Sequence, residues 1–293
     1  MSDFIQELSK RAALVDQALE ALLPSPETFP PLIHQAMRYS VLEGGKRLRP
    51  VLMLAAAEAV GGKAQDFISA ACAFELIHAY SLVHDDLPAM DNDDYRRGKL
   101  SNHKVYGEAT AILTGDALLT MAMQLLAESS GKPENVLRVI RETAIWAGSQ
   151  GLIGGQVVDT LSEGIEFDEA TIEYIHNHKT GALFKAAVRA GAILAGATEA
   201  QITALTSYAE YLGLAFQIKD DILDLEGNEQ IIGKAVGSDA KNNKATYPAL
   251  FGLSKSRDKA REAAGNALSS LQGFGAEADF LRSMVNYVIE RDF

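Results

Sequence analysis

Two groups of aspartates in this chain have the spacing of a site for divalent cations. The first is His84-Asp85-Asp86-Leu87-Pro88-Ala89-Met90-Asp91, and the second is Asp220-Asp221-Ile222-Leu223-Asp224. A helix of 3.6 residues per turn places Asp220 and Asp224 on one face, with Asp221 beside them. Carboxylates packed together repel one another unless a hard cation lies between them. Mg²⁺ fits, because it binds one or two carboxylates, keeps water ligands and shares the phosphate oxygens of a substrate.

Pro88 would allow the first, longer cluster to converge. Asp85 and Asp91 lie about 120° away from a common face of a straight helix. Proline lacks a backbone N–H and clashes with the carbonyl four residues earlier, so the helix kinks or ends here and Asp91 returns towards Asp85. Arg96 and Arg97 follow, and guanidinium forks suit phosphate oxygens.

Acidic runs are usually solvated helix faces, but both of these adjoin strongly apolar sequence, residues 70–83 and 211–218. Carboxylates at the end of a buried helix rarely lack partners. We therefore predict that the two clusters face each other across one cavity. Each cluster would hold Mg²⁺, and the metal ions would hold a diphosphate.

Composition restricts the function classes. The 293 residues include 27 basic and 39 acidic side chains, a net charge of −12, which argues against a nucleic-acid partner. An anionic substrate then requires metal ions between acid and anion. Cys72 is the single cysteine, so no intrachain disulfide forms, and packing is its expected role. We find no signal peptide and no uncharged apolar run of membrane length, so we expect a cytoplasmic enzyme without stable membrane association.

Helical periodicity covers most of the chain, and alternating strand patterns with turn dipeptides are absent. Thr28 and Asp168 are expected to cap helices. We predict an all-α, single-domain bundle over residues 1–293, with the site built inward between helices. The expected helices are residues 2–22, a segment after Thr28 to 43, 51–60, 66–87, 109–128, 134–149, a helix from 168, one from 200 through the second acid cluster, and two within 256–291.

Two further stretches carry polar chemistry. Gly44-Gly45-Lys46-Arg47-Leu48-Arg49-Pro50 is either a helix end with solvated charges or a seat for an anion, and the metal clusters favour the anion. His176-Asn177-His178-Lys179-Thr180-Gly181 interrupts an apolar helix and indicates a kink at a working site. His78 lies about two turns before Asp85 on nearly the same side, where it could donate to a phosphate oxygen.

Together these residues resemble the trans-isoprenyl diphosphate synthases, in particular the bacterial type of farnesyl diphosphate synthase. The resemblance covers nearly the whole chain, with one small departure at Leu100-Ser101, where the family more often has Pro-Thr. It rests on Gly44 to Pro50, Asp85-Asp86-x4-Asp91, Arg96-Arg97, Gly154-Gly155-Gln156, Lys179-Thr180-Gly181, Gln217 with Asp220-Asp221-x2-Asp224, and Lys244-x-Thr246-Tyr247-Pro248.

The resemblance implies a role for each matching residue, a Mg²⁺ cofactor (three ions per site, replaceable by Mn²⁺) and a homodimer. The implied substrates are isopentenyl, dimethylallyl and geranyl diphosphate. The implied metal residues are Asp85, Asp91 and Asp220, with Asp86, Asp221 and Asp224 as direct or supporting acids. The allylic diphosphate would be bound by Arg96, Lys179 and Lys234, and isopentenyl diphosphate by Lys46, Arg49, His78 and Arg97. The groups that would face the allylic carbon are Thr180, the Lys179 carbonyl and Gln217. The cations that would close the site are Lys244 and Arg291.

Tyr80 and Ser81 precede the first acid cluster and resemble the pattern of enzymes that stop at the farnesyl product. Tyr80 lies about 7.5 Å up the helix from Asp85. A geranylgeranyl or geranyl product is the alternative, and Tyr80 can equally be a core residue.

Other classes explain less of the sequence. A metal phosphohydrolase of the HD type would use His84-Asp85 but needs further histidine ligands. A terpene cyclase shares the acid motif but has no use for a second diphosphate seat. A Ca²⁺ module at Asp91 to Asp94 lacks the glycine and glutamate that its loop requires. A purely structural bundle leaves every charged motif without a role.

Overall fold

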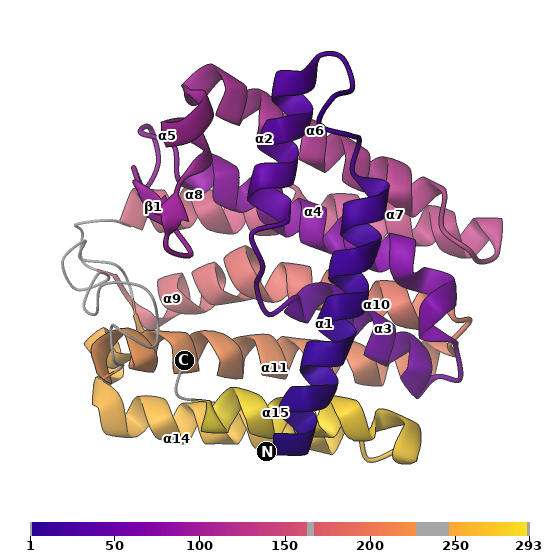
Figure 1. Ribbon diagram of the computed structural model, residues 1–293. Helices are drawn as coiled ribbons and strands as arrows, with labels where there is room; N and C mark the ends of the chain where they lie inside the picture. Colours follow the sequence, from indigo (N-terminus) through magenta and orange to yellow (C-terminus); the bar gives the residue numbers. More distant parts are fainter. Residues whose placement is uncertain (1, 163–166, 227–245, 292–293) are drawn as a thin grey trace.

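The computed structural model describes residues 2–162, 167–226 and 246–291, and these are almost entirely helical (Figure 1). The α-helices are α1 (Ser2–Leu22), α2 (Pro31–Val41), α3 (Leu48–Ala59), α4 (Ile68–Asp85), α5 (Asn102–Tyr106), α6 (Glu108–Ala127), α7 (Pro133–Ala147), α8 (Leu152–Ser162), α9 (Glu169–Ile175), α10 (Gly181–Leu194), α11 (Glu199–Glu226), α14 (Tyr247–Ser270) and α15 (Asp279–Glu290). Two 3₁₀ turns, η1 (Ala64–Phe67) and η3 (Ala276–Ala278), and one π-helical segment, η2 (His176–Thr180), complete the helical elements.

The centre of the bundle is formed by α4 and α10, which are apolar nearly all round and buried along most of their length. α6 packs on α4, α3 packs on α10, and α11 packs on both α10 and α14. In Figure 1, α11, α14 and α15 form the lower layer, α2, α4 and α6 form the upper one, and α9 and α10 lie between them. The predicted all-α bundle is confirmed.

One β-hairpin departs from the sequence prediction. β1 (Tyr95–Arg96) pairs antiparallel with β2 (Lys99–Leu100). The two turn residues, Arg97 and Gly98, both have positive φ, 52° and 79°. This is the geometry of a tight hairpin turn whose twist matches that of the strands. The turn dipeptide carries no asparagine or aspartate, so the sequence pattern missed it.

Of the two predicted caps, one is confirmed and one is wrong. Asp168 accepts a hydrogen bond from the backbone N–H of Thr171 at 2.9 Å at the start of α9. Thr28 does not cap α2. That helix starts at Pro31 after Pro30, with no side-chain cap, because proline at the first position has no N–H to satisfy.

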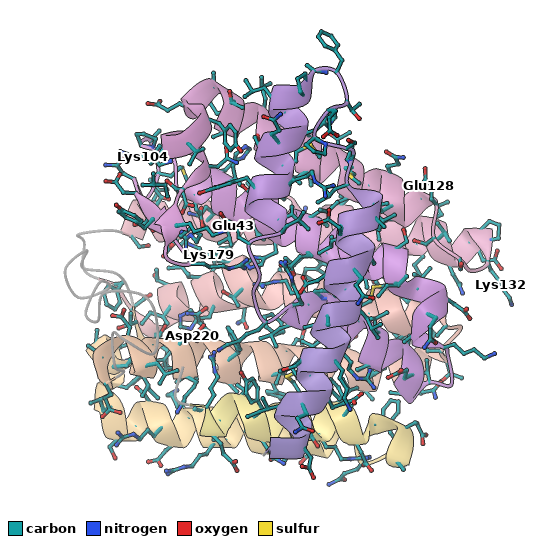
Figure 2. All side chains as sticks on the ribbon, viewed as in Figure 1. Glu43, Lys104, Glu128, Lys132, Lys179 and Asp220 are labelled. Atoms are coloured by element: carbon teal, nitrogen blue, oxygen red, sulfur yellow. The ribbon has the colours of Figure 1, made fainter. Side chains whose placement is uncertain are left out.

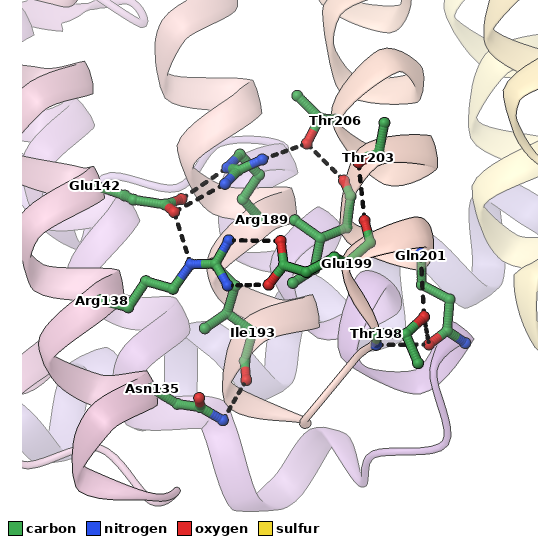
Figure 3. A network of polar contacts seen from close by, with 11 residues as sticks. Asn135, Arg138, Glu142, Arg189, Ile193, Thr198, Glu199, Gln201, Thr203 and Thr206 are labelled. Carbon is green, nitrogen blue, oxygen red and sulfur yellow. Dashed lines mark hydrogen bonds and ion pairs between the residues drawn. The ribbon is translucent and has the colours of Figure 1, made fainter.

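A network of charged side chains ties α7, α10 and α11 together away from the acid clusters (Figure 3). Arg189 donates to Glu142 at 2.7 and 2.8 Å and to Thr206 at 2.7 Å. Arg138 joins the same Glu142 at 3.0 Å and also pairs with Glu199. Partly exposed ion pairs contribute little singly, but this network links three helices whose packing positions the central layer.

Two segments, residues 64–85 and 108–127, are long and apolar enough to cross a membrane by length and composition alone, although each contains acidic residues. In the first, 67% of the most apolar window is buried within the bundle, against 39% in the second. The burial of the first segment is that of a central bundle helix, which needs the same apolar composition.

Candidate active site

The first acid cluster folds back on itself at the end of α4. That helix ends at Asp85, and the backbone N–H of Asp91 donates to the carbonyl of Asp85 at 2.9 Å. This confirms the return of the chain that Pro88 predicts. Burial raises the pKa of the Asp85 carboxyl to about 6, opposed by Lys179 and reinforced by Asp91 and Asp159. A carboxylate so placed gains from any cation that approaches it.

Lys179 reaches this carboxylate from the π-helical segment η2. Its Nζ lies 2.6 Å from Asp159 Oδ2 on α8 and 3.8 Å from Asp85 Oδ2. The approach depends on Gly155, since a Cβ there would lie 2.2 Å from the backbone nitrogen of Lys179. The predicted kink in this helix is thus a π segment, whose wider turn projects Lys179 and Thr180.

Asp86 points away from Asp85, towards the hairpin. Its side chain is buried and accepts from Arg96 Nε at 3.0 Å, with a second, shorter contact from Arg96 Nη2. Arg96 also donates to Asp93 at 3.2 Å. The predicted metal residue Asp86 is therefore bound to the predicted diphosphate residue Arg96, and together they fix the hairpin beside the cluster.

The three aspartates of the second cluster have different surroundings on α11. Asp220 forms an ion pair with Arg291 and is 39% exposed. Asp221 is only 3% exposed and accepts from Gln217 Nε2 and from the backbone N–H of Tyr247, each at 3.0 Å. Asp224 is half-buried. Figure 2 shows Asp220 on α11 in the layer next to that of Lys179, and α11 packs directly on η2.

These donors fit Mg²⁺ as a bridging ion, not as an enclosed one. Within the three described ranges, no three His, Cys, Asp or Glu side chains converge into a complete metal site. Mg²⁺ does not need one, because water and substrate phosphate supply its remaining ligands. Asp85 and Asp91 are the fitting residues on one side, and Asp220 with Asp224 on the other. Asp86 and Asp221 are each only 3% exposed and bound by protein donors, whereas the side chain of Asp220 is paired with Arg291 but 39% exposed.

Lys46 and Arg49 lie near Asp220, and His78 lies near Arg49 and Arg97. Burial lowers the pKa of Lys46 to about 8, together with Arg291 and against Asp220. Burial likewise lowers the pKa of Arg49 to about 10, and holds the pKa of His78 well below its usual range together with Arg49 and Arg97. Burial is the largest cause of all three shifts, and a bound diphosphate would favour the charged forms of Lys46 and Arg49.

Gly44 and Gly45 leave room for the side chain of Arg97 beside the segment that carries Lys46 and Arg49. Arg97 donates to the carbonyl of Gly44, and a Cβ on Gly45 would lie 2.9 Å from the Arg97 guanidinium carbon. Gly45 has a φ of +130°, which other residues rarely adopt. The predicted anion seat therefore brings Lys46, Arg49 and Arg97 together.

Arg47, the remaining cation of this segment, points into the core instead. It is 3% exposed and donates to Asp16 at 2.7 Å, to Glu75 at 2.6 Å and to the carbonyl of Val41 at 2.7 Å. Its function is to anchor the segment to α1, α2 and α4.

Thr180 and Gln217 meet between η2 and α11. The Thr180 hydroxyl donates to Gln217 Oε1 at 2.8 Å, and both residues are half-buried. The two residues that the resemblance places at the allylic carbon are thus neighbours.

A cavity of about 470 Å³ begins at Asp85 and runs between α4 and α8. Tyr80 and Ser81, the predicted chain-length residues, form its α4 side. The α8 side is mostly apolar, and a stripe at helical spacing, Ile153, Val157 and Leu161, lies on it. The lining residues are Tyr80, Ser81, His84, Asp85, Met90, Leu152, Ile153, Gln156, Val157, Thr160 and Leu161.

Two predicted residues, Lys234 and Lys244, lie outside the described residues. Asp159 is a site residue that sequence reasoning passed over. Its one signal was that it shares a helix face with Gln156, beside the glycine pair.

Comparison with known proteins identifies the fold and the family of this chain. Residues 30–287 match the family model described as polyprenyl synthetase. The farnesyl diphosphate synthase of Geobacillus stearothermophilus is 46% identical over 286 residues, which cover 96% of both chains. The large subunit 1 of the heterodimeric chloroplast geranylgeranyl pyrophosphate synthase of Arabidopsis thaliana is 45% identical, over 99% of this chain and 80% of that protein.

A solved structure of similar fold agrees with this family match. The FPP/GFPP synthase of Zymomonas mobilis has a TM-score of 0.87 and 37% identity, covering 98% of this chain and 99% of that chain. Fold, matched length and relatives all point the same way. The chain belongs to the polyprenyl synthetase family of prenyltransferases.

Proposed function

We propose that this protein condenses isopentenyl diphosphate with dimethylallyl or geranyl diphosphate and releases (2E,6E)-farnesyl diphosphate. The observation that carries the proposal is the cavity of about 470 Å³, because its lining includes Asp85 of the first acid cluster together with a mostly apolar wall on α8. A prenyl diphosphate has the same two parts, an anionic head and an apolar tail.

Basic side chains would take up the charge that builds on the leaving diphosphate. Lys179 and Arg96 lie near the first acid cluster. Lys46 and Arg49 lie near Asp220, and Arg97 lies near Arg49. Mg²⁺ held by the aspartates would supply Lewis-acid neutralisation of the same charge. Two cationic regions suit two diphosphates, one on each substrate.

Dipoles rather than nucleophiles would face the reacting carbon. The allylic C–O bond breaks with its electron pair going to diphosphate, and the double bond of isopentenyl diphosphate supplies the pair for the new C–C bond. A proton then leaves, with diphosphate as its acceptor. The Thr180 hydroxyl, the Lys179 carbonyl and the Gln217 amide would stabilise the cation without capturing it.

The product length rests on Tyr80 and Ser81, which lie on the α4 wall of the cavity. Tyr80 is 5% exposed, and its bulk would block a growing chain. A geranylgeranyl product is the second candidate, and the geranylgeranyl synthases among the relatives favour it.

The test is incubation with labelled isopentenyl diphosphate, each allylic primer and Mg²⁺, followed by chromatographic sizing. Farnesyl diphosphate as the main product supports the proposal. Geranylgeranyl diphosphate would replace the finer assignment, and primer hydrolysis without elongation would refute the reaction. Exhaustive chelation should abolish elongation, and Mn²⁺ should restore part of it.

We also propose a homodimer. Several large apolar side chains are exposed on α6 and α7, outside the cavity lining, as an interface between copies requires. Size-exclusion chromatography with light scattering tests this, and a monomer at micromolar concentration would contradict it. These side chains are Ile112, Leu113, Leu137 and Ile145.

A further inference from the structure

A chain of three hydrogen bonds leads from the buried core to the candidate reaction centre. The backbone N–H of Tyr247 donates to Asp221 Oδ2 at 3.0 Å. Gln217 Nε2 donates to Asp221 Oδ1 at 3.0 Å, and the Thr180 hydroxyl donates to Gln217 Oε1 at 2.8 Å. His176 packs beside it, with Nε2 3.5 Å from Asp221 Oδ2 and its ring stacked on Tyr247.

The direction of every bond follows from the chemistry of its ends. A backbone N–H only donates, and an ionised carboxylate only accepts. The Gln217 amide must therefore turn its NH₂ group to Asp221, which leaves its oxygen for Thr180. The hydroxyl hydrogen of Thr180 is then committed to Gln217. The lone pairs of Thr180, the negative end of its dipole, are left for other neighbours.

We propose that Asp221 is a positioning residue that sets the polarity of Thr180 and Gln217 towards the allylic cation. This inference rests on the proposed function. It gives Asp221 a role different from the metal ligation that its acidic sequence motif implies. A carboxylate that is 3% exposed and accepts from two protein donors is poorly placed to bind a hydrated Mg²⁺.

The substitution Asp221→Asn tests the polarity with almost no change of shape. The Tyr247 N–H would hold the oxygen of the new amide, so its NH₂ group would face Gln217. Gln217 would have to flip and present its own NH₂ to Thr180. The Thr180 hydroxyl would then accept, and its hydrogen would point towards the cation. We expect a fall in kcat on the order of 10²-fold, as for the loss of one oriented dipole.

A second substitution should restore the direction. In the double variant Asp221→Asn with Gln217→Glu, the new Asn donates to the new Glu and still accepts from Tyr247. The Glu again accepts from the Thr180 hydroxyl, and the net charge is that of the wild type. We expect the kcat of the double variant to be at least about tenfold higher than that of Asp221→Asn alone.

Magnesium affinity provides a readout besides activity. Titration calorimetry with Mg²⁺ and inorganic diphosphate should give affinities within about twofold of wild type for Asp221→Asn. Asp220→Asn, the positive control, should lose about tenfold or more. Asp258→Asn, an exposed carboxylate on α14, is the neutral control for loss of one charge and should leave kcat unchanged.

The outcomes separate cleanly. A double variant no faster than Asp221→Asn would overturn the relay. So would a tenfold loss of Mg²⁺ affinity in Asp221→Asn with kcat restored at saturating Mg²⁺. If the wild type elongates no primer, the proposed function fails first. Recovery in the double variant with unchanged Mg²⁺ affinity supports the relay.

Discussion

Gly155→Ala should damage the site by separating α8 from the π segment. The added Cβ would lie 2.2 Å from the backbone nitrogen of Lys179 and 2.7 Å from the carbonyl carbon of His178. These are backbone atoms, which cannot rotate away as the end of a side chain can. Cβ contacts below 3.0 Å essentially never occur and ordinary contact begins at 3.4 Å, so the two segments must move apart by about 0.8 to 1.2 Å.

That displacement has two measurable consequences. Overpacking costs about 1–3 kcal/mol, partly offset by about 0.5–1 kcal/mol from replacing a helical glycine with alanine. The same movement lengthens the 2.6 Å contact between Lys179 and Asp159. A misplacement of about 1 Å at a reacting centre costs on the order of 10²-fold in rate, so kcat should fall by about that factor.

Thermal unfolding and steady-state elongation assays measure both effects against two matched glycines. Gly265→Ala, exposed on α14 with no atom within 4 Å, should gain about 0.5–1 kcal/mol and keep its activity. Gly191→Ala, whose Cβ would lie 2.0 Å from the Met53 carbonyl between α10 and α3, should lose stability. The close-packing argument is refuted if Gly155→Ala matches Gly265→Ala in both melting temperature and kcat.

Three other changes give separate tests. Tyr80→Ala should lengthen the products, because it widens the cavity beside Ser81; an unchanged product spectrum removes Tyr80 from chain-length control. With a Lys46 pKa of about 8 in the free protein, KM for isopentenyl diphosphate should rise above pH 8, and Lys46→Arg should abolish that rise; identical pH profiles would count against the seat. Burial lowers the pKa of His176 to about 3. Because the unfolded chain binds this proton from about pH 6.5 downwards, stability should fall by about 2 kcal/mol at pH 5. Denaturant unfolding of His176→Asn should lack that loss, and equal losses would contradict it.

The sequence predicted those features that depend on near neighbours along the chain. Apolar spacing located most of the helices to within a few residues, and Pro88 predicted the return of Asp91 to Asp85. The same spacing placed the start of α14 at residue 256, although the helix begins at Tyr247, and it did not predict α5 or α8. The polar interruption at Lys179 and Thr180 indicated a kink, which is the π segment. Each of these follows from local backbone chemistry, which a single sequence contains.

The sequence did not predict the features that depend on residues far apart along the chain. Asp86 and Asp221 look like their neighbours in an acidic run, but Arg96 binds the first, and Gln217 and Tyr247 bind the second. Asp159 becomes part of the site only because the glycines of α8 let η2 approach. A carboxylate's role is decided by which donors the fold brings to it, and this information lies outside the spacing of the run.

The burial of Arg47 has a consequence for the entropy of ligand capture. With its guanidinium fixed by Asp16 and Glu75, the backbone on either side cannot reorganise. The segment that carries Lys46 and Arg49 is therefore ordered before any anion arrives. A loop that ordered itself on binding would lose conformational freedom at that moment, whereas this one has already lost it during folding. Loosening the anchor should weaken anion affinity even though Arg47 itself never meets the anion.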